Sequence, residues 1–401
     1  MFIATSLNAQ LARAQADHLR VLVVGAGVAG LTLGQALRAG GLHPVLVERA
    51  ADHADDGYML ALMPLVEPVL RQAGVRDAYR ARSVRFHRYV LHGRHGQRLR
   101  EYAIDSLLSR YGEYRGIARG ELMQALADEG AAVSYATTLQ ALRQTPEAAH
   151  VVLREGDSTH EAVFDAVVLA DGLHSSSREL LLPAQQVSTF DCGWGGWVAW
   201  MDSDAAHADR GDEIWGSDFF VGVYPVRGRA GVFVGGHRDD TRAGPQAFVA
   251  HIRSQLRHVD DWLLRALESV AESGDTPYYW KLTDIRSATW AVQRTVLLGD
   301  AAAGFVPTAG IGAGMAMESA GVLARQLLAT DRAGVPVALH DYERVQRPRV
   351  ESAQDNSRAL TKLMCRRSPA LATVRDVVAR FVTLKAALGP IRKLLDSAPE
   401  M

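Results

Sequence analysis

The first apolar runs of the chain alternate with turns rich in glycine. Residues 21–24 are four consecutive apolar residues, which predict a strand buried on both faces, as is typical of a parallel sheet. A glycine turn follows at 25–30, residues 31–38 predict a helix, and residues 44–47 predict a second strand. This order of strand, turn, helix and strand indicates a dinucleotide-binding unit.

The glycine turn has the spacing G-x-G-x-x-G. In this pattern Gly25 allows the tight turn, Gly27 lets the backbone approach a pyrophosphate, and Gly30 lets the helix pack closely on the strand. The helix then offers free N–H groups and a partial positive charge to the phosphates. Glu48 follows the second strand, near the spacing at which an acid meets a ribose hydroxyl. The sequence therefore predicts a dinucleotide site here.

A different pattern follows, and it predicts an inserted sheet. Residues 84–91 and 97–102 alternate as the two strands of a hairpin. From 187 to 280, short aromatic and apolar runs are separated by glycine and acidic turns, which predicts an antiparallel sheet with one wet face and one aromatic face. Residues 246–271 predict a helical cover for that sheet.

Two later stretches predict further parts of the dinucleotide site. Within residues 164–178, an apolar run leads to Asp171 and a glycine. Polar cap residues and an expected helix follow. Residues 295–298 predict a buried strand that places Asp300 at its carboxyl end, where ligands bind in open α/β sheets. A loop rich in proline and glycine then points a helix N-terminus at whatever Asp300 contacts. Arg119 lies at the start of an expected helix over 117–126.

The last part of the chain predicts helices, with breaks at Pro348, Pro369 and Pro390. A basic amphipathic segment there could lie on a membrane, but we favour helices that pack over the two domains. No apolar run is long enough for a membrane span, and residues 1–19 read as an extension or a short helix rather than as a signal peptide. The apolar stripe of this segment consists of Leu371, Val374, Val377, Val378, Phe381 and Leu384.

Composition narrows the classes of function. A formal net charge of -1 gives no reason to expect a nucleic-acid partner. The chain has two cysteines, Cys192 and Cys365, which lie far apart in sequence without C-x-x-C spacing. We therefore expect neither a disulfide framework nor a metal site, and a reducing, cytoplasmic location fits.

Taken in order, the three glycine-containing stretches around Gly25, Asp171 and Asp300 resemble the single-component flavoprotein monooxygenases related to para-hydroxybenzoate hydroxylase. The resemblance covers residues from about 20 to 347. It implies an α/β fold: a Rossmann-like FAD-binding domain of the glutathione reductase type, an inserted antiparallel β-sheet domain for substrate, and C-terminal helices. The expected boundaries are 20–81, 104–186 and 281–353 for the FAD-binding domain, 82–103 and 187–280 for the substrate domain, and 354–401 for the C-terminal segment.

The resemblance also implies roles for individual residues. Glu48 corresponds to the acid on the adenosine ribose, Arg119 to an arginine near the FAD linker, Asp171 to a position associated with FAD and NAD(P)H, and Asp300 to the ribityl contact. The residues expected to bind FAD are Gly25, Gly27, Ala29, Gly30, Glu48, Arg49, Arg119, Asp171, Asp300, Pro307, Gly310, Gly312, Ala313 and Gly314. The candidate residues lining the substrate pocket are Trp200, Tyr224, His237 and Pro307.

The implied reaction is aromatic hydroxylation. NADH or NADPH would reduce FAD, O2 would add at the flavin C4a position, and the hydroperoxide would pass one oxygen to an aromatic or polyketide-like small molecule of secondary metabolism. The sequence assigns no catalytic side chain. It leaves open NADH against NADPH, hydroxylation against Baeyer–Villiger insertion, and the oligomeric state.

Other activities of the same fold remain as alternatives. The chain could keep FAD as a structural element and act as a non-redox cyclase or a ligand-binding protein. A prenyl reductase fits the aromatic sheet less well. A flavin-dependent halogenase needs a lysine in the N-terminal region, and no lysine precedes Lys281. The sequence departs from the family in having Ala303 after Gly-Asp-Ala-Ala, where a histidine is usual.

Overall fold

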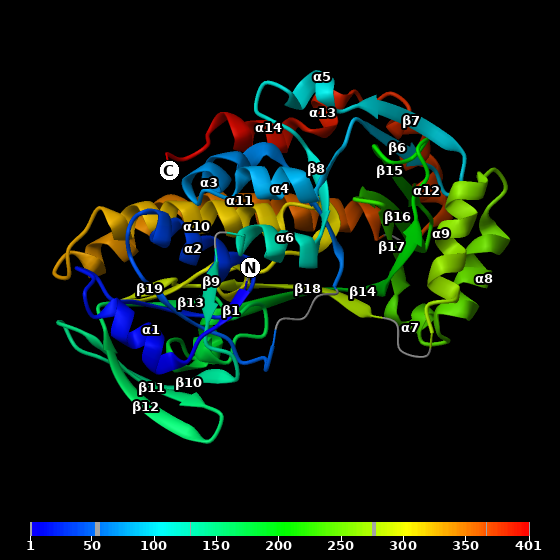
Figure 1. Ribbon diagram of the computed structural model, residues 1–401. Helices are drawn as coiled ribbons and strands as arrows, with labels where there is room; N and C mark the ends of the chain where they lie inside the picture. Colours follow the sequence, from blue (N-terminus) through cyan, green and yellow to red (C-terminus); the bar gives the residue numbers. More distant parts are fainter. Residues whose placement is uncertain (1, 53–56, 129, 275–277, 366, 401) are drawn as a thin grey trace.

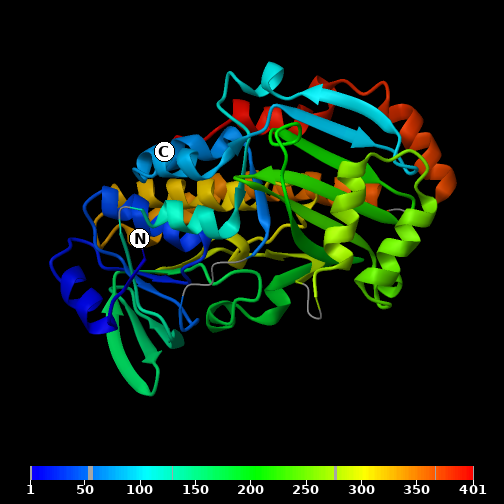
Figure 2. The ribbon, with the colours of Figure 1, turned by 45° about the vertical axis from the view of Figure 1, so that its right-hand side comes forward.

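The computed structural model describes residues 2–52, 57–128, 130–274, 278–365 and 367–400. Part of the expected acidic loop over residues 51–57, namely 53–56, lies outside the described residues. The chain folds around two large sheets that lie side by side in Figures 1 and 2, with a long helix running past both of them.

The first large sheet has five strands in the order β19-β20-β13-β2-β3. All neighbouring pairs are parallel except β19 with β20. Its strands are short runs of buried residues, which is the pattern of a parallel sheet covered on both faces. The bounds are β2 Val21–Val24, β3 Val45–Val47, β13 Ala166–Leu169, β19 Ala291–Val292 and β20 Thr295–Leu297.

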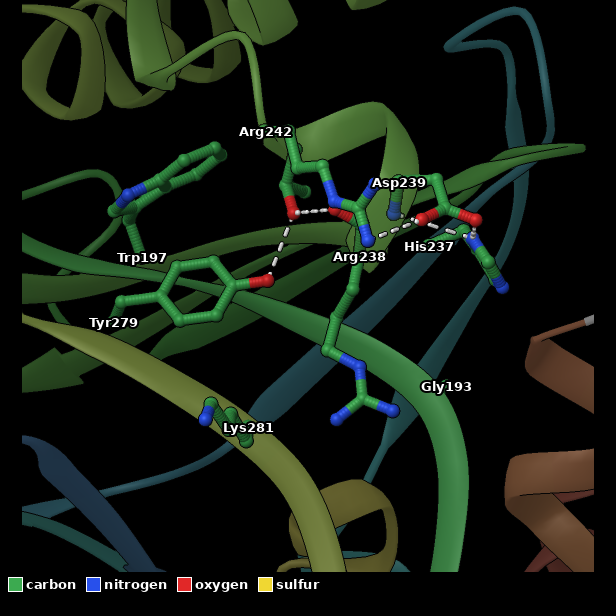
Figure 3. A pocket seen from close by; sticks show the side chains of 9 residues that line it. Gly193, Trp197, His237, Arg238, Asp239, Arg242, Tyr279 and Lys281 are labelled. Atoms are coloured by element: carbon green, nitrogen blue, oxygen red, sulfur yellow. Dashed lines mark hydrogen bonds and ion pairs between the residues drawn. The ribbon is translucent and has the colours of Figure 1, made fainter.

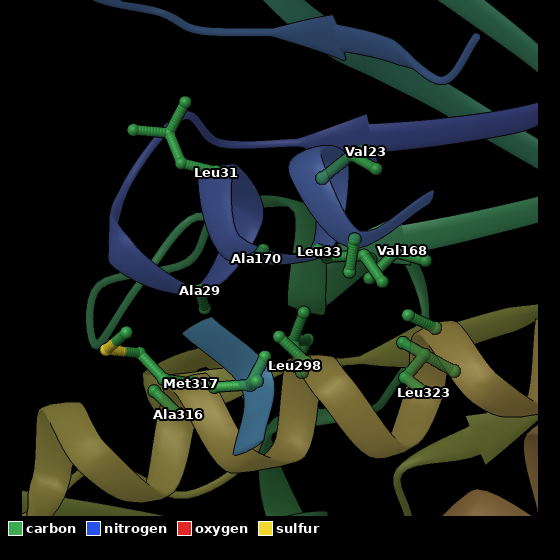
Figure 4. Close-up of a cluster of buried hydrophobic side chains, with 14 of the residues drawn as sticks. Val23, Ala29, Leu31, Leu33, Val168, Ala170, Leu298, Ala316, Met317 and Leu323 are labelled. Atoms are coloured by element: carbon green, nitrogen blue, oxygen red, sulfur yellow. The ribbon is translucent and has the colours of Figure 1, made fainter. Parts of the chain in front are cut away.

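Helices α2 (Val28–Ala39) and α10 (Gly312–Leu328) pack against each other over the five-stranded sheet. Figure 4 shows their apolar side chains meeting those of β2, β13 and the residue after β20. Almost every residue of α2 from Ala29 to Leu37 is buried, as expected of a helix enclosed between a sheet and a second helix. The α/β part of the predicted fold is confirmed.

The second large sheet has seven strands in the order β18-β14-β17-β16-β15-β6-β7. Neighbouring strands are antiparallel except β15 and β6, which are parallel. The β6–β7 hairpin is therefore an edge of this sheet, as expected of an inserted segment. The bounds are β6 Arg88–His92, β7 Arg98–Ala103, β14 Val187–Asp202, β15 Arg210–Trp215, β16 Phe219–Val226, β17 Arg229–His237 and β18 Tyr279–Ser287.

The prediction that one face of this sheet is wet is wrong. Helices α8 (Pro245–Gln255) and α9 (Asp261–Ala271) cover one face, where Val221, Val232 and Leu263 are fully buried. The opposite face carries a second buried cluster with Trp194 and Phe233. Strand β17 is apolar or glycine at nearly every position, which is the pattern of a strand buried on both faces.

The remaining strands form three small sheets. One is an antiparallel meander of β10 to β12; another joins β4, β8 and β5; and β1 pairs with β9 in parallel. Helix α1 confirms the short helix expected near the N-terminus. The bounds are β1 Phe2–Ala4, β4 Met59–Leu62, β5 Val84–Arg85, β8 Arg115–Ala118, β9 Ala131–Val133, β10 Thr137–Gln144, β11 Ala149–Glu155, β12 Ser158–Phe164 and α1 Leu7–Ala14.

Several expected helices differ from the prediction. The helix expected over 117–126 begins only at Arg119, because Ile117 belongs to the strand β8. The helix expected after Asp171 is a single 3₁₀ turn, η2. The shorter helical elements are η1 Pro64–Val66, α3 Glu67–Gln72, α4 Arg76–Arg82, α5 Asp105–Leu108, α6 Arg119–Leu126, η2 Ser177–Leu180, η3 Ala184–Gln186, α7 Arg238–Thr241, η4 Gly299–Ala301 and η5 Pro307–Ala309.

The break expected at Pro348 does not occur, since α11 runs from Val335 to Met364 through this proline. Packing on α10 explains why the helix continues. Arg349 donates two hydrogen bonds to the buried carboxylate of Glu318, at 2.6 and 2.9 Å, and Gln346 donates to the same carboxylate at 2.9 Å. These contacts, two residues before and one residue after the proline, hold both halves of the helix in line.

The C-terminal helices are α12 (Pro369–Ala379), α13 (Leu384–Ala387) and α14 (Gly389–Asp396). The expectation that the apolar stripe packs over the domains is wrong for most of the stripe. Leu371, Val374, Val377, Val378 and Phe381 are between 46 % and 77 % exposed. Among the described helices, none is both long enough and apolar enough to cross a lipid bilayer.

The seven-stranded sheet meets the small sheet of β4, β8 and β5 where β16 passes β8, and this contact requires a glycine. A Cβ atom on Gly116 would lie 2.0 Å from the backbone oxygen of Pro225. A change of side-chain rotamer cannot relieve this clash, because the atom that the Cβ would meet belongs to the backbone. We expect Gly116→Ala to lower the free energy of unfolding by about 1–3 kcal/mol, the usual cost of overpacking.

Gly389→Ala is the matched control for this prediction, because a Cβ on Gly389 would meet nothing within 4 Å. Urea denaturation of both variants measures the difference. Equal stability of the two variants would show that the sheets are not held at this distance.

Candidate functional site

The glycine turn between β2 and α2 touches the end of β13. A Cβ on Gly25, whose φ is +102°, would lie 2.6 Å from the oxygen of Ala170 and 2.8 Å from the Cα of Asp171. A Cβ on Gly30 would lie 1.9 Å from the oxygen of Gly25. Both positions therefore require glycine. Parallel pairing of β2 with β13 brings these two distant stretches of sequence to the same edge of the sheet.

The stretch around Asp300 reaches the same place from the other side of β13. Gly299 has φ +62°, and a Cβ there would lie 2.8 Å from the Cβ of Ala29 and 3.4 Å from that of Ala316. The turn after Asp171 is tied to this stretch by Arg178, which donates to the oxygen of Ala301 at 3.1 Å. All three predicted stretches therefore converge at the carboxyl ends of three neighbouring strands.

The start of α2 has room for a phosphate. A Cβ built on Gly27 would meet no described atom within 4 Å outside its chain neighbours. Within the described residues, no side chain caps the first turn of α2 or of α10. Uncapped N–H groups at a helix start are the usual ligands of an anion, so these residues fit the phosphates of a dinucleotide.

Glu48 stands beside the glycine turn. Its carboxylate accepts hydrogen bonds from the N–H groups of Ala26 and Ala50, each at 2.9 Å. The half-buried carboxylate keeps further acceptor positions, which could receive a ribose hydroxyl. Arg49 is exposed next to it.

Asp171 has a turn-forming role in the structure. Its carboxylate accepts from the hydroxyl of Ser175 at 2.6 Å and from the N–H of Ser177 at 3.2 Å. Gly172, which follows it, has φ +85° and open space around it. Asp171 could therefore contact a cofactor mainly by fixing the turn beside Gly25.

The charge of Asp300 acts on the nearby phenol of Tyr58. Asp300 is exposed at the surface, but many protein atoms surround its carboxyl group. The resulting desolvation raises the pKa of Asp300 to about 6. Burial, followed by the charge of Asp300, raises the pKa of Tyr58 to about 12, while the charge of Arg119 opposes this shift. Tyr58 is therefore a neutral phenol between a carboxylate and a guanidinium.

The geometry around Arg119 explains why Gly57 precedes the tyrosine. The N–H of Arg119 donates to the oxygen of Tyr58 at 2.9 Å, and a Cβ on Gly57 would lie 3.2 Å from the Arg119 side chain. The arginine side chain thus passes directly over the glycine.

Tyr58 was not among the predicted site residues, although it joins the two sheets. Its ring lies 4.7 Å from that of Trp280 and stacks on Tyr278 at 6.3 Å, centroid to centroid. The next residue, Met59, would touch any side chain placed on Gly231 of the seven-stranded sheet. The only sequence signal was an aromatic residue directly after an acidic loop, which has many ordinary explanations.

The loop before α10 lies beside β4. Gly310 has the left-handed φ of +59°, and its Cβ would come 3.9 Å from the oxygen of Ala61. Thr308 donates to the oxygen of Ser357 on α11 at 3.0 Å, which fixes Pro307 and its neighbours. Helix α10 starts directly after this loop, so Gly312, Ala313 and Gly314 form its uncapped first turn, next to β4.

Of the candidate substrate residues, Trp200 and Tyr224 lie together. Both are register partners of Gly231, one from each neighbouring strand, on the face that meets Met59. Tyr224 donates to the buried carboxylate of Glu213 at 2.5 Å, and the guanidinium of Arg229 lies 4.0 Å from the centroid of the Trp200 ring. His237 is six residues further along β17, about 20 Å away.

His237 lines an open groove of about 720 Å³ beside α7. Figure 3 shows Trp197, Tyr279 and Lys281 facing this groove from β14 and β18, with Arg238 and Arg242 opposite. Trp197 belongs to the face covered by α8 and α9, so the groove lies on the other side of these strands from Trp280. The structure does not bring His237 together with the other candidate residues. Among the described residues, no group of three or more acidic, His or Cys side chains could hold a metal ion.

Comparison with known proteins identifies the family. Residues 18–357 match the family described as FAD binding domain, so the chain belongs to it. It is 29% identical over 350 residues to the aurachin C monooxygenase/isomerase of Stigmatella aurantiaca, covering 84% of this chain and 86% of that protein. It is 29% identical over 356 residues to the 3-amino-4-hydroxybenzoate 2-monooxygenase PtnB3 of Streptomyces platensis, covering 84% and 87%.

Solved structures show the same fold. Klebsiella pneumoniae HpxO, complexed with FAD and uric acid, matches with a TM-score of 0.84 at 20% identity, over 95% of this chain and 98% of that one. The predicted fold class, family and FAD cofactor are therefore confirmed. The assignment of individual residues to parts of FAD is our proposal.

We expect Asp300→Ala to weaken FAD binding about tenfold to a hundredfold, since loss of a hydrogen bond to a charged group costs about 1.5–3 kcal/mol. Titration of the apoprotein with FAD, followed by flavin fluorescence, measures the dissociation constant.

Asp341→Ala is the control for Asp300→Ala, because Asp341 pairs only within its own helix, with Arg344 at 2.9 Å. If the Asp300 variant kept its yellow colour through gel filtration as well as the control does, the placement of the ribityl chain would be wrong.

Proposed function

We propose that this chain is a FAD-dependent monooxygenase that takes electrons from NADH or NADPH and transfers one oxygen atom of O2 to an electron-rich aromatic small molecule. The family and the monooxygenase relatives show the class of enzyme, and an aromatic substrate is proposed here because relatives such as the 3-amino-4-hydroxybenzoate 2-monooxygenase act on one. The electron donor, the use of O2 and the individual residues are the other proposed parts. FAD supplies the redox chemistry when it is bound.

In this proposal, each of the three stretches that meet at the sheet edge holds a different part of FAD. The turn from Gly25 to Gly30 and the start of α2 would hold the phosphates, and Glu48 would accept from the adenosine ribose. Asp300 would accept from the ribityl hydroxyls, with Arg119 near the linker. The uncapped start of α10 would stabilise negative charge on the ring system, because its N–H groups point out of the helix end.

The observation that carries this proposal is the position of Tyr58. The charges of Asp300 and Arg119 both act on its hydroxyl group, and its ring lies 4.7 Å from the ring of Trp280, centroid to centroid. A cofactor held by Asp300 therefore lies next to the aromatic face of the seven-stranded sheet. An apolar, aromatic surface at this point both accepts a flat ring and excludes water from the reaction.

The face next to Tyr58 is the proposed substrate surface. Trp194, Val198, Phe233 and Leu282 form its buried base, and Phe220 and Trp280 border it. Glu213 accepts from Trp215 at 2.8 Å as well as from Tyr224, so its carboxylate is already occupied and positions these rings. Trp200 and Tyr224 remain proposed lining residues, together with Pro307.

We also retain the expected division of the chain into domains as a proposal: 20–81, 104–186 and 281–353 for FAD, 82–103 and 187–280 for substrate, and 354–401 as the C-terminal segment. The two large sheets support this division, although β18 continues past residue 281 within the seven-stranded sheet. A cytoplasmic location is a further proposal, supported by Cys192 and Cys365 both being free thiols.

We expect aromatic ligands to accelerate reduction of the bound FAD by NADPH or NADH. Anaerobic stopped-flow absorbance across a panel of aminohydroxybenzoates, purines and quinolones measures this rate. Admission of O2 should then re-oxidise the flavin and yield a product heavier by one oxygen, which mass spectrometry detects. FAD that stays oxidised with every ligand and both donors would favour the non-redox cyclase or binding-protein alternative.

We expect Trp280→Leu to raise KM for the aromatic substrate about tenfold, since loss of an aromatic contact and its buried area costs about 1–2 kcal/mol, while FAD remains bound. His237→Ala, in the groove on the other side of β14, should leave kcat/KM within twofold. Steady-state kinetics on the substrate found in the panel decide between them. A larger loss in the His237 variant would place the substrate in the groove.

A further inference from the structure

Helix α12 is turned the opposite way from an ordinary surface helix. Its larger aliphatic residues, Leu371, Val374, Val377 and Val378, face solvent, and Phe381 just beyond the helix is 77 % exposed. Its buried positions are instead Ala372, Asp376 and Ala379. A helix in a globular protein normally buries its apolar side. Contiguous exposed apolar residues of this kind mark an interaction site.

Polar contacts fix this orientation. Asp376 accepts from the N–H of Arg94 at 2.9 Å and from the side chain of Gln97 at 3.4 Å, both next to the β6–β7 hairpin. Arg375 donates to the oxygen of Gly216 at 3.0 Å, and Arg94 donates to the oxygen of Pro369 at 3.2 Å. The helix is therefore held to the sheet edge by its polar side. Rotation to bury the valines would break all of these bonds.

Nothing else in the described chain covers the exposed side. Figure 2 shows α12, in orange-red at the upper right, at the outer edge of the molecule beside the cyan strands β6 and β7. The hairpin lies behind α12, where Arg100 donates to the oxygen of Arg380 at 2.6 Å and Tyr102 donates to that of Val382 at 3.0 Å.

The rim of this surface is basic. From residue 367 to residue 393 the chain carries six arginine and lysine residues and one acid, the buried Asp376; of the six, Arg375 is buried against Gly216, and Arg392 and Lys393 lie on α14. Arg380 and Lys385 are exposed at the C-terminal end of α12, and Arg367, paired with Asp240, lies before its N-terminal end. Apolar side chains bordered by cations are the composition of a helix that lies in the interface of an anionic bilayer.

We propose that α12, with Phe381, is a docking surface for the headgroup region of an anionic phospholipid membrane. The apolar residues enter the boundary between headgroups and acyl chains, and the cations lie at the level of the phosphates. A second copy of the chain is the alternative occupant of this face, and the experiment below distinguishes it from the membrane. The helix lies on the membrane and does not cross it.

The experiment uses the full-length, FAD-loaded protein and sedimentation with vesicles of phosphatidylcholine, with and without added phosphatidylglycerol. We expect binding to the anionic vesicles, weakening as salt is added. The double variant Val374→Ser and Phe381→Ser should reduce this binding more than about tenfold, since several buried methylene equivalents are lost. Arg380→Gln with Lys385→Gln should remove the preference for anionic lipid.

Val337→Ser with Val345→Ser is the matched control, because these valines are 66% and 39% exposed on α11. They lie in the half of this 30-residue helix, about 45 Å long, that is remote from α12. The control should bind as the unchanged protein does. FAD absorbance and thermal unfolding confirm that each variant is folded.

Failure of the unchanged protein to bind anionic vesicles would overturn the proposal, and so would equal binding by the Val374 and Phe381 variant. A dimer in sedimentation velocity that this variant converts to a monomer would assign the face to a second copy instead. Neither outcome bears on flavin reduction, so the proposed activity is tested separately.

Discussion

Backbone contacts too close for any side chain bring this protein's site together. At Gly25 and Gly299 a Cβ atom would lie between 2.6 and 2.8 Å from atoms of another segment, and at Gly30 it would lie 1.9 Å from the oxygen of Gly25 in the same turn. Such approaches place the starts of α2 and η4 and the end of β13 within one small region. Since each segment comes from a separate part of the chain, the glycines let a parallel sheet present three polar turns at one edge.

The second requirement is that the loop before α10 stays fixed. Thr308 is anchored to α11, and α11 is joined to α10 by the buried pair of Glu318 and Arg349. A buried carboxylate without a partner would be costly, so this pair holds the two helices in one register even if its net contribution to stability is small. The uninterrupted course of α11 through Pro348 serves the same purpose.

The sequence was informative where chemistry is local. The positions of Gly25, Glu48 and Asp300 follow from short-range rules for turns, strand ends and helix starts, and the structure brings their surroundings together. Tyr58 could not be found in this way, because its partners Arg119 and Trp280 are remote in sequence. The orientation of α12 was also unpredictable, since the hydrogen bonds of Asp376 to the β6–β7 hairpin, rather than the apolar stripe, decide which side is buried.

The pKa of Asp300 indicates which kind of ligand can offset the desolvation of its carboxylate. Desolvation raises this pKa to about 6, so at neutral pH the carboxylate is charged in surroundings that oppose the charge. Tyr58, whose pKa is about 12, stays neutral and offers no countercharge. A ligand that displaces water from Asp300 must therefore supply hydrogen-bond donors of its own, because a desolvated carboxylate without hydrogen bonds is unstable. A chain of hydroxyl groups provides such donors without adding charge, and the ribityl chain of FAD has this chemistry. A purely aromatic ligand at Asp300 would not offset the cost, which supports our proposal that the substrate lies on the other side of Tyr58.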